Sequence, residues 1–536
     1  MKHAFSILIV FCFYAFPAIS QKPILCWGEE IKDVSNKKSI MAFGEREIDN
    51  SCWFVPNIGK IDDDILCVSH KSNRSSENTV LYKLSAGQME LKEAIQLPRN
   101  LSENDNLQSN FKGAYFWNKK ICLFDVCYNQ NYTKGIVKVE TFSANGSKIL
   151  KKECLVLEEK PIFSKKDVYI VFCEDSTKLA VVAMIGNNET KNITLLIKLF
   201  DADFNELTKN KIEIPYEFEE TIFGNIKFLK DGQLYFPVKT YFKKAPRGLP
   251  SYENYLYQVS TDGTNNMTIY KIELDTKWIN CYNYLLDSKD NLIVAGFYSE
   301  KSEFSSKGHF YQVYEKNDKT PRISEYKNFS DEFRKAYLRG YFAKKDAEIW
   351  TLRITDFLKR KDGSTILIFE EGYSFGGGKD IKVNAKGNLE TTTSNTLPNY
   401  FYDDIGIFNI DPQGKITWFN FIHKHMVSIF RNEVTFGLLA TDDQLCFVYI
   451  EKIDQFNKSD KAKLKETRLE GKVDFAKKSL VVAVVIDNNG KKQKFNLSGT
   501  EKTGLPKYAL ITYTPFNGKE LVLSYNINTV GKVILE

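Results

Sequence analysis

Paired carboxylates are the residues of this chain whose types and spacing are best suited to chemistry. The pairs Glu370-Glu371 and Asp403-Asp404 stand on either side of a long polar stretch. Two carboxyl groups at a suitable separation can act as acid and base on a glycosidic bond, or can bind calcium. Turns and solvated strand ends use the same residue types, and this simpler interpretation stays open. We predict a ligand pocket here, with tyrosines that stack on a sugar or peptide, formed by Glu370, Tyr373, Tyr400, Tyr402, Asp403 and Asp404.

Two histidines, His423 and His425, stand two residues apart and form the second candidate. On a strand, this spacing places both imidazoles on one face, and zinc can bind there if a third ligand converges. No acidic partner motif or further histidine motif accompanies them, so two polar side chains at an exposed strand end are the simpler interpretation. We therefore predict no metal and no other cofactor. His423 and His425 are the candidate ligands if a metal binds.

A repeated strand pattern must position these residues. Eight short apolar segments read alike, and most of them follow an acidic, amide or glycine turn such as Asp231-Gly232. A recurring period indicates a repeat architecture, and four-strand units joined by Asp-Gly hairpins are typical of propeller blades. We predict an all-β fold, a β-propeller of eight four-stranded blades, with seven blades as the alternative. The eight segments are residues 65–68, 121–124, 179–183, 234–238, 292–297, 365–369, 445–449 and 521–525.

The last unit of the repeat is incomplete, because it supplies three strands before the chain ends. Residues 23–27 near the N-terminus form an apolar segment without a unit of its own. An exposed sheet edge invites aggregation, so closing the ring removes a liability. We predict that residues 23–27 pair with residues 532–535.

Three stretches interrupt the period. Residues 331–349 have the composition of a short helix before a strand at 350–352, residues 373–400 read as a long polar loop, and residues 452–477 read as a charged loop. Loops of this length are usually functional or disordered. We predict one propeller domain over residues 21–536 with insertions at these three places.

The N-terminus has the pattern of a secretory signal peptide. A basic start precedes an apolar run from Ala4 to Ala18, and Ala18-Ile19-Ser20 is a small-x-small cleavage site. We predict that residues 1–20 are removed. The product is then exported to the periplasm, the cell surface or the medium, with no integral membrane span, because the apolar run is short for one.

Charge and cysteine content limit the partners. The 74 basic and 68 acidic residues are interspersed, without the basic block that nucleic-acid binding favours. Export permits disulfides, and Cys122 with Cys127 or Cys154 with Cys173 are candidate pairs. Nine cysteines follow the predicted cleavage site, and an odd number rules out complete intramolecular pairing.

Several motifs, at residues 350–357, 361–363, 370–373, 402–405 and 409–418, combine an Asp-Gly hairpin, a Tyr-x-Asp-Asp-Ile strand and an Asp-x-x-Gly-x-Ile-x-Trp hairpin. They resemble a group of exported propeller-like proteins of Bacteroidota, and the resemblance covers most of residues 160–425. It implies the fold and export. The group has no established activity, so the resemblance implies no catalytic residue.

The absence of a GxSxG motif and of any recognisable Ser-His-Asp arrangement favours a protein that is not an enzyme. We predict an exported binding or scaffold propeller that acts through its rim loops on a protein or glycan of the cell envelope. The alternative is a hydrolase or lyase that acts on extracellular carbohydrate or peptide, with carboxylates near the central channel. Three or more ionisable side chains that converge there would favour the alternative.

Overall fold

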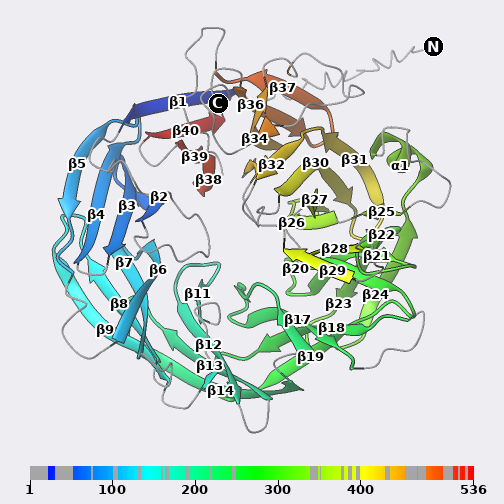
Figure 1. The fold of residues 1–536 in the computed structure, drawn as a ribbon, viewed down its shortest axis with the longest axis horizontal. Coiled ribbons are helices and arrows are strands. Elements are labelled where there is room, and N and C mark those ends of the chain that lie inside the picture. Colours follow the sequence, from blue (N-terminus) through cyan, green and yellow to red (C-terminus); the bar gives the residue numbers. More distant parts are fainter. Residues whose placement is uncertain are drawn as a thin grey trace, which may run out of the picture.

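The chain forms a ring of eight antiparallel blades, seen in Figure 1 down the axis of the ring. The computed structural model describes residues 22–30, 52–73, 76–99, 107–129, 135–157, 161–162, 168–187, 192–217, 220–243, 249–337, 348–350, 352–375, 379–383, 389–393, 399–428, 435–452, 456, 467–468, 479–498, 511–516, 520–525 and 529–535. The predicted signal peptide lies outside these residues. The prediction of an eight-bladed all-β propeller is confirmed.

In each blade the strands follow one another from the axis outward. Blades 1 to 4 consist of β2 (Cys52–Ile61), β3 (Asp64–Asn73), β4 (Ser76–Ser85) and β5 (Leu91–Gln96); β6 (Leu107–Trp117), β7 (Lys120–Asn129), β8 (Gly135–Phe142) and β9 (Lys148–Leu157); β10 (Pro161–Ile162), β11 (Val168–Phe172), β12 (Leu179–Asn187), β13 (Asn192–Phe200) and β14 (Glu206–Glu217); and β15 (Thr221–Phe223), β16 (Lys227–Phe228), β17 (Leu234–Tyr241), β18 (Tyr252–Val259) and β19 (Met267–Ile272). In blades 3 and 4 the innermost strand is split into two pieces.

The second half of the ring carries additional elements between its blade strands. Blades 5 to 8 consist of β20 (Trp278–Leu286), β21 (Leu292–Ser299), β23 (Gly308–Tyr314) and β24 (Pro321–Asn328); β26 (Leu352–Lys359), β27 (Thr365–Phe375), β30 (Asn399–Ile410) and β31 (Ile416–Ile422); β33 (Gly437–Ala440), β34 (Gln444–Lys452), β36 (Ser479–Asp487) and β37 (Lys492–Asn496); and β38 (Ile511–Phe516), β39 (Glu520–Tyr525), β40 (Thr529–Leu535) and β1 (Pro23–Glu30).

Blade 8 joins the two ends of the described chain. Strand β1 pairs antiparallel with β40, with Pro23 opposite Leu535 and Trp27 opposite Gly531. Figure 1 shows the blue β1 beside the red β40, which completes the ring. The predicted contact between residues 23–27 and residues 532–535 is confirmed, and it covers an edge that β40 would otherwise expose.

The core lies between neighbouring blades, because both faces of the middle strands are covered. Strands β21 and β23 are buried along their whole length, whereas β24 at the periphery is largely exposed. Between blades 5 and 6, the rings of Phe297 and Phe408 lie 4.9 Å from the ring of Phe369. Gly406 lies beneath the Phe369 ring so closely that a Cβ there would be 2.1 Å from it, which explains glycine at this position.

The two faces of the ring differ in their connections. One face, the turn face, carries tight turns in which an aspartate accepts backbone N–H groups two and four residues ahead, as Asp411 does from Gln413 (3.0 Å) and Lys415 (2.8 Å). The other face, the loop face, carries the connections between second and third strands and between successive blades. Among the described residues, seven short elements stand outside the blade strands, and all lie in loop-face connections of blades 5 to 7: α1 (Asp331–Tyr337), a pair of β22 (Ser305–Ser306) and β25 (Ile349–Trp350), a hairpin of β28 (Lys379–Val383) and β29 (Leu389–Thr393), β32 (Met426–Ser428) and β35 (Thr467–Arg468).

The three predicted insertions are thus on one face of the ring. The helix predicted within residues 331–349 is confirmed as α1, whose Phe333 and Tyr337 fill the junction of blades 5 and 6. The prediction of a plain polar loop over residues 373–400 is wrong. Strands β27 and β30 continue beyond the body of blade 6, and β28 pairs with β29 between them. The segment at 350–352 is also divided, since Trp350 pairs with Ser305 and not with blade 6.

Neither candidate disulfide forms, because Cys122, Cys127, Cys154 and Cys173 carry no disulfide bond in the structure. Cys122 and Cys127 are five residues apart on the extended strand β7, which separates them by roughly 16 Å. Cys154 packs between blades 2 and 3, whereas Cys173 packs between blades 3 and 4. Burial raises the pKa of the Cys154 thiol to about 12, so it behaves as a small apolar side chain.

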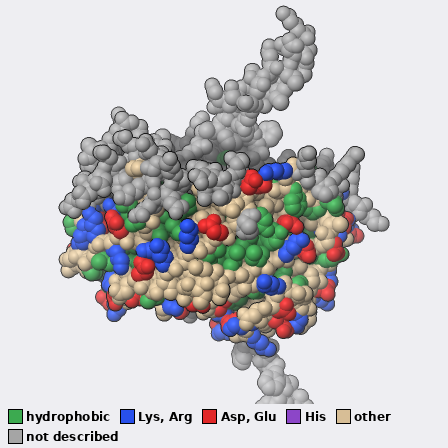
Figure 2. Space-filling model, turned by 90° about the horizontal axis from the view of Figure 1, so that it is seen from below, with side chains coloured by type: hydrophobic (Ala, Val, Ile, Leu, Met, Phe, Trp, Pro, Cys, Tyr) green, Lys and Arg blue, Asp and Glu red, His purple; other side chains and the backbone are tan. Residues whose placement is uncertain are grey.

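Positive and negative side chains are interspersed over the side of the ring that Figure 2 shows. Within the described part of the chain, no helix combines the length and the apolar character needed to span a bilayer.

Candidate functional site

The predicted pocket residues lie on the loop face of blade 6, where its sheet is irregular. Glu370 pairs with Ile405 and Gly372 pairs with Tyr402, so Asp403 and Asp404 together stand opposite the single residue Glu371. The neighbouring strand is interrupted at the same level, because β31 ends at Ile422 and β32 begins at Met426. A bulge of this kind redirects side chains at a sheet rim.

Glu370 is the centre of a buried ionic cluster, which we call the Glu370 cluster. Its side chain is fully buried, and its carboxylate accepts from Lys424 Nζ at 2.5 Å and from Arg353 Nη2 at 2.5 Å. Thr435 Oγ1 donates to the same carboxylate, and Lys424 Nζ also donates to the Tyr402 carbonyl oxygen at 3.2 Å. Arg353 and Glu370 belong to blade 6, whereas Lys424 and Thr435 lie in the connection to blade 7. The cluster therefore joins two blades.

The two aspartates each bind one histidine. His423 Nδ1 lies 2.6 Å from Asp404 Oδ2, and His425 Nδ1 pairs with Asp403 Oδ1. The prediction that both imidazoles share one face of a strand is wrong, because residues 423–425 form the interruption between β31 and β32. Among the described residues, no group of three or more His, Cys, Asp or Glu side chains is arranged to hold a metal ion.

The tyrosines of the predicted pocket are separated. Tyr402 is buried, and the Arg353 guanidinium lies over its ring at 5.1 Å. Tyr400 is half-buried against the core of blades 6 to 8. The side chain of Tyr373 lies outside the described residues. The structure thus gathers Glu370 and Tyr402 in one cluster and attaches Asp403 and Asp404 to histidines, in contacts that are internal to the protein; a ligand-binding role for these residues stays a prediction.

A second buried ionic cluster, the Arg99 cluster, joins blades 1 and 2. Arg99 follows β5, and its guanidinium donates to Asp125 on β7 and to Glu140 Oε2 on β8 at 3.0 Å. His70 on β3 lies 3.3 Å from Arg99 and 2.8 Å from Thr79 Oγ1. Burial raises the pKa of Asp125 to about 6, and burial together with the Arg99 charge lowers the pKa of His70 to about 3.

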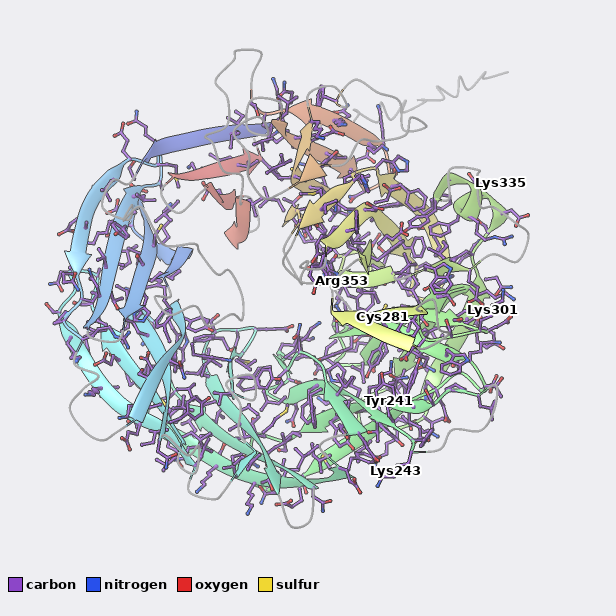
Figure 3. The ribbon with its side chains drawn as sticks, in the orientation of Figure 1. Tyr241, Lys243, Cys281, Lys301, Lys335 and Arg353 are labelled. Carbon is purple, nitrogen blue, oxygen red and sulfur yellow. The ribbon has the colours of Figure 1, made fainter. Side chains whose placement is uncertain are left out.

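A cavity of about 430 Å³ opens among the inner strands of blades 4, 5 and 6, and we call it the axial cavity. Figure 3 shows Cys281, one of its lining residues, close to the central opening of the ring. Its volume falls in the range of ligand pockets. The apolar residues of its walls include Pro237, Tyr282, Ile354 and Phe357. The polar residues come from three blades and include Lys227, Lys239, Asn280 and Asp356.

Lys227 is the fixed cation of the axial cavity. Its ammonium donates to Asn283 Oδ1 at 2.7 Å and to the Tyr284 carbonyl oxygen at 3.0 Å, and it lies 4.6 Å from the centre of the Tyr284 ring. These partners are neutral. Burial lowers the pKa of Lys227 to about 8, and the carboxylates of Glu174 and Asp356 oppose this shift.

Asp356 and Asn280 also line the axial cavity. Burial raises the pKa of the Asp356 carboxyl, while a hydrogen bond from Thr355 and the charge of Lys227 act in the opposite direction. The Asn280 amide donates to Ser306 Oγ at 2.7 Å and to the Ser305 carbonyl oxygen, but its Oδ1 is buried without a partner among the described residues. Perturbed titratable groups beside an open volume are typical of functional sites.

Sequence patterns offer little sign of the axial cavity, because its polar residues are dispersed over some 130 positions, from Asn225 to Asp356. The one available indication was the repeat itself, which places the first strand of each unit at the axis.

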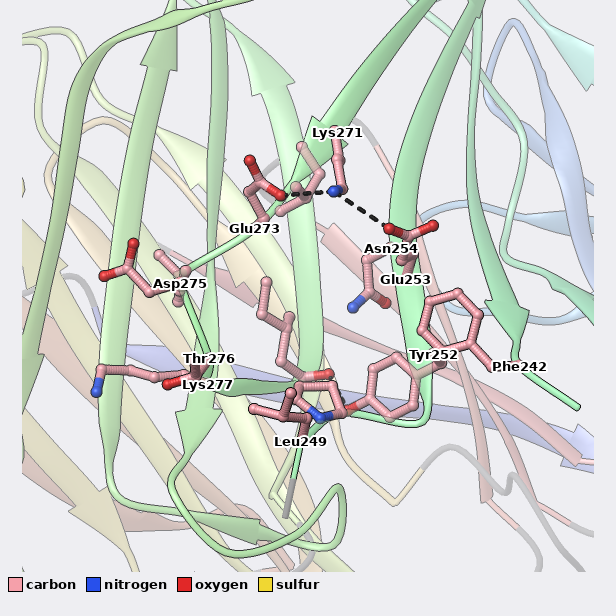
Figure 4. A pocket seen from close by; sticks show the side chains of 14 residues that line it. Phe242, Leu249, Tyr252, Glu253, Asn254, Lys271, Glu273, Asp275, Thr276 and Lys277 are labelled. Carbon is pink, nitrogen blue, oxygen red and sulfur yellow. Dashed lines mark hydrogen bonds and ion pairs between the residues drawn. The ribbon is translucent and has the colours of Figure 1, made fainter. Parts of the chain in front are cut away.

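A smaller cavity of about 220 Å³, the rim cavity, opens on the loop face of blade 4 (Figure 4). Phe242, Leu249 and Tyr252 line it. Lys271 crosses its wall with ion pairs to Glu253 (3.1 Å) and Glu273 (2.8 Å), drawn as dashed lines in Figure 4. Asn254 lines both cavities.

No protein-family model matches the chain, and no curated protein matches it. Solved structures resemble it in fold. The polysaccharide lyase Uly1 is 8% identical with a TM-score of 0.37, covering 97% of this chain and 100% of its own. The propeller domain of the Trilobed protease from Pyrococcus furiosus, described as an open velcro topology, is 12% identical with a TM-score of 0.36, covering 84% and 96%. The endosialidase of phage phi92 is 9% identical with a TM-score of 0.30, covering 89% and 85%. At these values the likeness concerns the fold alone.

Proposed function

We propose that this protein is an exported binding propeller that holds a polar ligand of saccharide size in the axial cavity. The observation that carries the proposal is a ligand-sized volume whose apolar walls hold a carboxyl group and an ammonium fixed by neutral partners. Pockets that recognise small polar ligands combine apolar surface with a few placed polar groups in this way. Export rests on the predicted signal peptide and on the resemblance to exported propellers, and the proposed partner is a glycan or protein of the cell envelope.

The proposed ligand site is the axial cavity and not the pocket predicted from the sequence around Glu370. The charges of the Glu370 cluster are paired with other residues of the protein, whereas Lys227 borders the open volume of the axial cavity. The loop face stays part of the proposal, because the additional elements of blades 5 to 7 lie on that face.

A binding screen against immobilised glycans tests the proposal, with Lys227→Met as the variant. Removing a charged hydrogen-bond donor should weaken binding by about tenfold or more. Lys361→Met is the matched control, because Lys361 is 78% exposed on the turn face and pairs with Asp442. Equal glycan affinity in the wild type and in Lys227→Met would contradict the proposed site.

The second candidate function is catalysis on the same ligand. The observation that favours it is that Lys227, with its pKa lowered to about 8, and Asp356, with its pKa raised, share one cavity. Groups whose pKa values approach the working pH are suited to proton transfer. The test is release of reducing ends or of unsaturated products from a bound glycan. If the protein is an enzyme, the wild type should convert the glycan to product, and Asp356→Asn should bind the glycan without converting it. If the wild type binds the glycan and forms no product, catalysis is contradicted and binding alone is supported.

A further inference from the structure

Three large hydrophobic side chains are strongly exposed in blade 4, in blade 5 and in the connection from blade 5 to blade 6. Trp350 is 63% exposed, Phe304 58% and Ile222 57%, the three highest values among large hydrophobic side chains of the described residues. Ile222 lines the axial cavity itself. Phe304 and Trp350 belong to the loop face, where Ser305, next to Phe304, pairs with Trp350 across the short β22–β25 sheet. We call this pair of aromatic residues the platform.

Two residues of the cavity wall contact the segment that carries the platform. Asn280 donates to the Ser305 carbonyl oxygen and to Ser306 Oγ. Lys239 donates to Glu303 Oε2 at 2.8 Å, directly before Phe304. The wall of the axial cavity is therefore hydrogen-bonded to the segment that carries Phe304 and that pairs with Trp350.

The surroundings of the platform are polar but balanced in charge. Glu303 pairs with Lys239, and Glu300 pairs with Lys277 at 3.4 Å and with Lys307. Glu348 is buried and accepts from Ser299 Oγ at 2.6 Å and from the Glu300 backbone N–H at 3.1 Å. Exposed aromatic side chains beside paired charges suit a ligand with apolar faces and polar edges, which is the surface of a neutral sugar ring.

We infer that the ligand is a chain of neutral sugar residues, which occupies the axial cavity and continues past Asn280 onto the Phe304–Trp350 platform. This inference rests on the proposed function and adds the class of ligand and a second contact region. Each aromatic face takes one sugar ring, so affinity increases with chain length until the platform is covered.

The experiment is calorimetry with neutral oligosaccharides of two and six residues, taken from the cellulose, laminarin, xylan and mannan series, with oligogalacturonate as an acidic comparison. In at least one neutral series the wild type should bind the six-residue chain about tenfold more tightly than the two-residue chain. Trp350→Ala should remove this gain and leave the two-residue affinity unchanged, which also shows that the variant is folded. Tyr326→Ala is the matched control, because Tyr326 is 42% exposed on the peripheral strand β24.

The outcomes separate this inference from the proposed function. A chain-length gain that persists in Trp350→Ala and in Phe304→Ala overturns the platform. Binding of oligogalacturonate alone overturns the neutral-sugar class and leaves the proposed cavity in place. Failure of every chain to bind, or binding that Lys227→Met does not alter, overturns the proposed function and this inference with it.

Discussion

Lys424 and Lys227 are both withdrawn from solvent, yet their surroundings differ. Lys424 is buried against the Glu370 carboxylate, in a cluster that also occupies Arg353 and Thr435. Lys227 meets an amide oxygen, a carbonyl oxygen and an aromatic face, and it borders the axial cavity. A buried cation that is paired with a carboxylate of the protein connects neighbouring blades. A cation that has neutral partners and borders an open volume can instead bind a ligand.

The Arg99 cluster belongs with Lys424 in this comparison. Arg99, Asp125 and Glu140 are almost completely buried and satisfy one another across the junction of blades 1 and 2. Both clusters place a cation from the connection between two blades onto a carboxylate of a blade strand. The buried charge therefore acts as an inter-blade tie in both places.

Lys424→Met should cause the largest loss of stability. It removes the fully buried one of the two cations bonded to the Glu370 carboxylate, and the loss of such a partner costs about 3–5 kcal/mol in comparable cases. The measurement is the free energy of unfolding in urea. The double variant Glu370→Gln with Lys424→Met should recover part of the loss, because the uncompensated charge is gone. A single variant within about 1 kcal/mol of the wild type would show that the cluster is not a tie.

His70 should make the Arg99 cluster sensitive to acid. Its pKa is lowered from 6.5 to about 3, so the unfolded chain takes up a proton as the pH falls below 6.5 while the folded chain does not. The contribution of His70 to the free energy of unfolding is therefore largest above pH 6.5, and it decreases as the pH falls toward 3. The raised pKa of Asp125 acts in the opposite direction between about pH 6 and 3.8.

The comparison of wild type with His70→Asn isolates the histidine. Between pH 7 and 4.5 the wild type should lose about 2–3 kcal/mol more than the variant, since asparagine takes up no proton. Urea unfolding at the two pH values measures this difference. If the free energy of unfolding falls equally in the wild type and in His70→Asn, His70 is not the cause of the acid sensitivity.

Lys227→Met should have the smallest effect on stability, within about 1 kcal/mol of the wild type, because no carboxylate of the described residues is bonded to this cation. The lowered pKa adds a test with a definite sign. Between pH 8 and 10.5 the unfolded chain holds a proton on Lys227 that the folded chain has released, so stability of the wild type should rise with pH in this window. The variant should lack this rise. A loss as large as that of Lys424→Met would end the distinction between the two lysines.

The fold was accessible from the sequence because its cause is local. Each blade can be recognised in the sequence by its apolar strands and its Asp-Gly turns. The last unit has only three strands, and Pro23–Trp27 supplies the fourth. The extent of the insertions was less accessible. The strand pairing of β28 with β29 and the extension of β27 and β30 depend on backbone partners that residue types alone do not fix.

The candidate sites were accessible only in part. Adjacent carboxylates drew attention to Glu370, Asp403 and Asp404, and these residues do gather on the loop face of blade 6. Their partners Arg353, Lys424 and His425 come from other strands and connections, so the sequence did not show that the charges are already paired. Cys122 and Cys127 illustrate the same limit, since closeness in the chain became separation on an extended strand.

The sequence by itself determined the repeat, the blade and the closure of the ring, because periodic burial and turn chemistry act over a few residues. Only the tertiary structure decided which charged side chains are paired inside the protein and which border a cavity. Lys227, Asn280 and Asp356 belong to three blades, and the curvature of the ring brings them to one cavity. Burial and the distance between charged atoms set their chemistry, and both are properties of the closed ring.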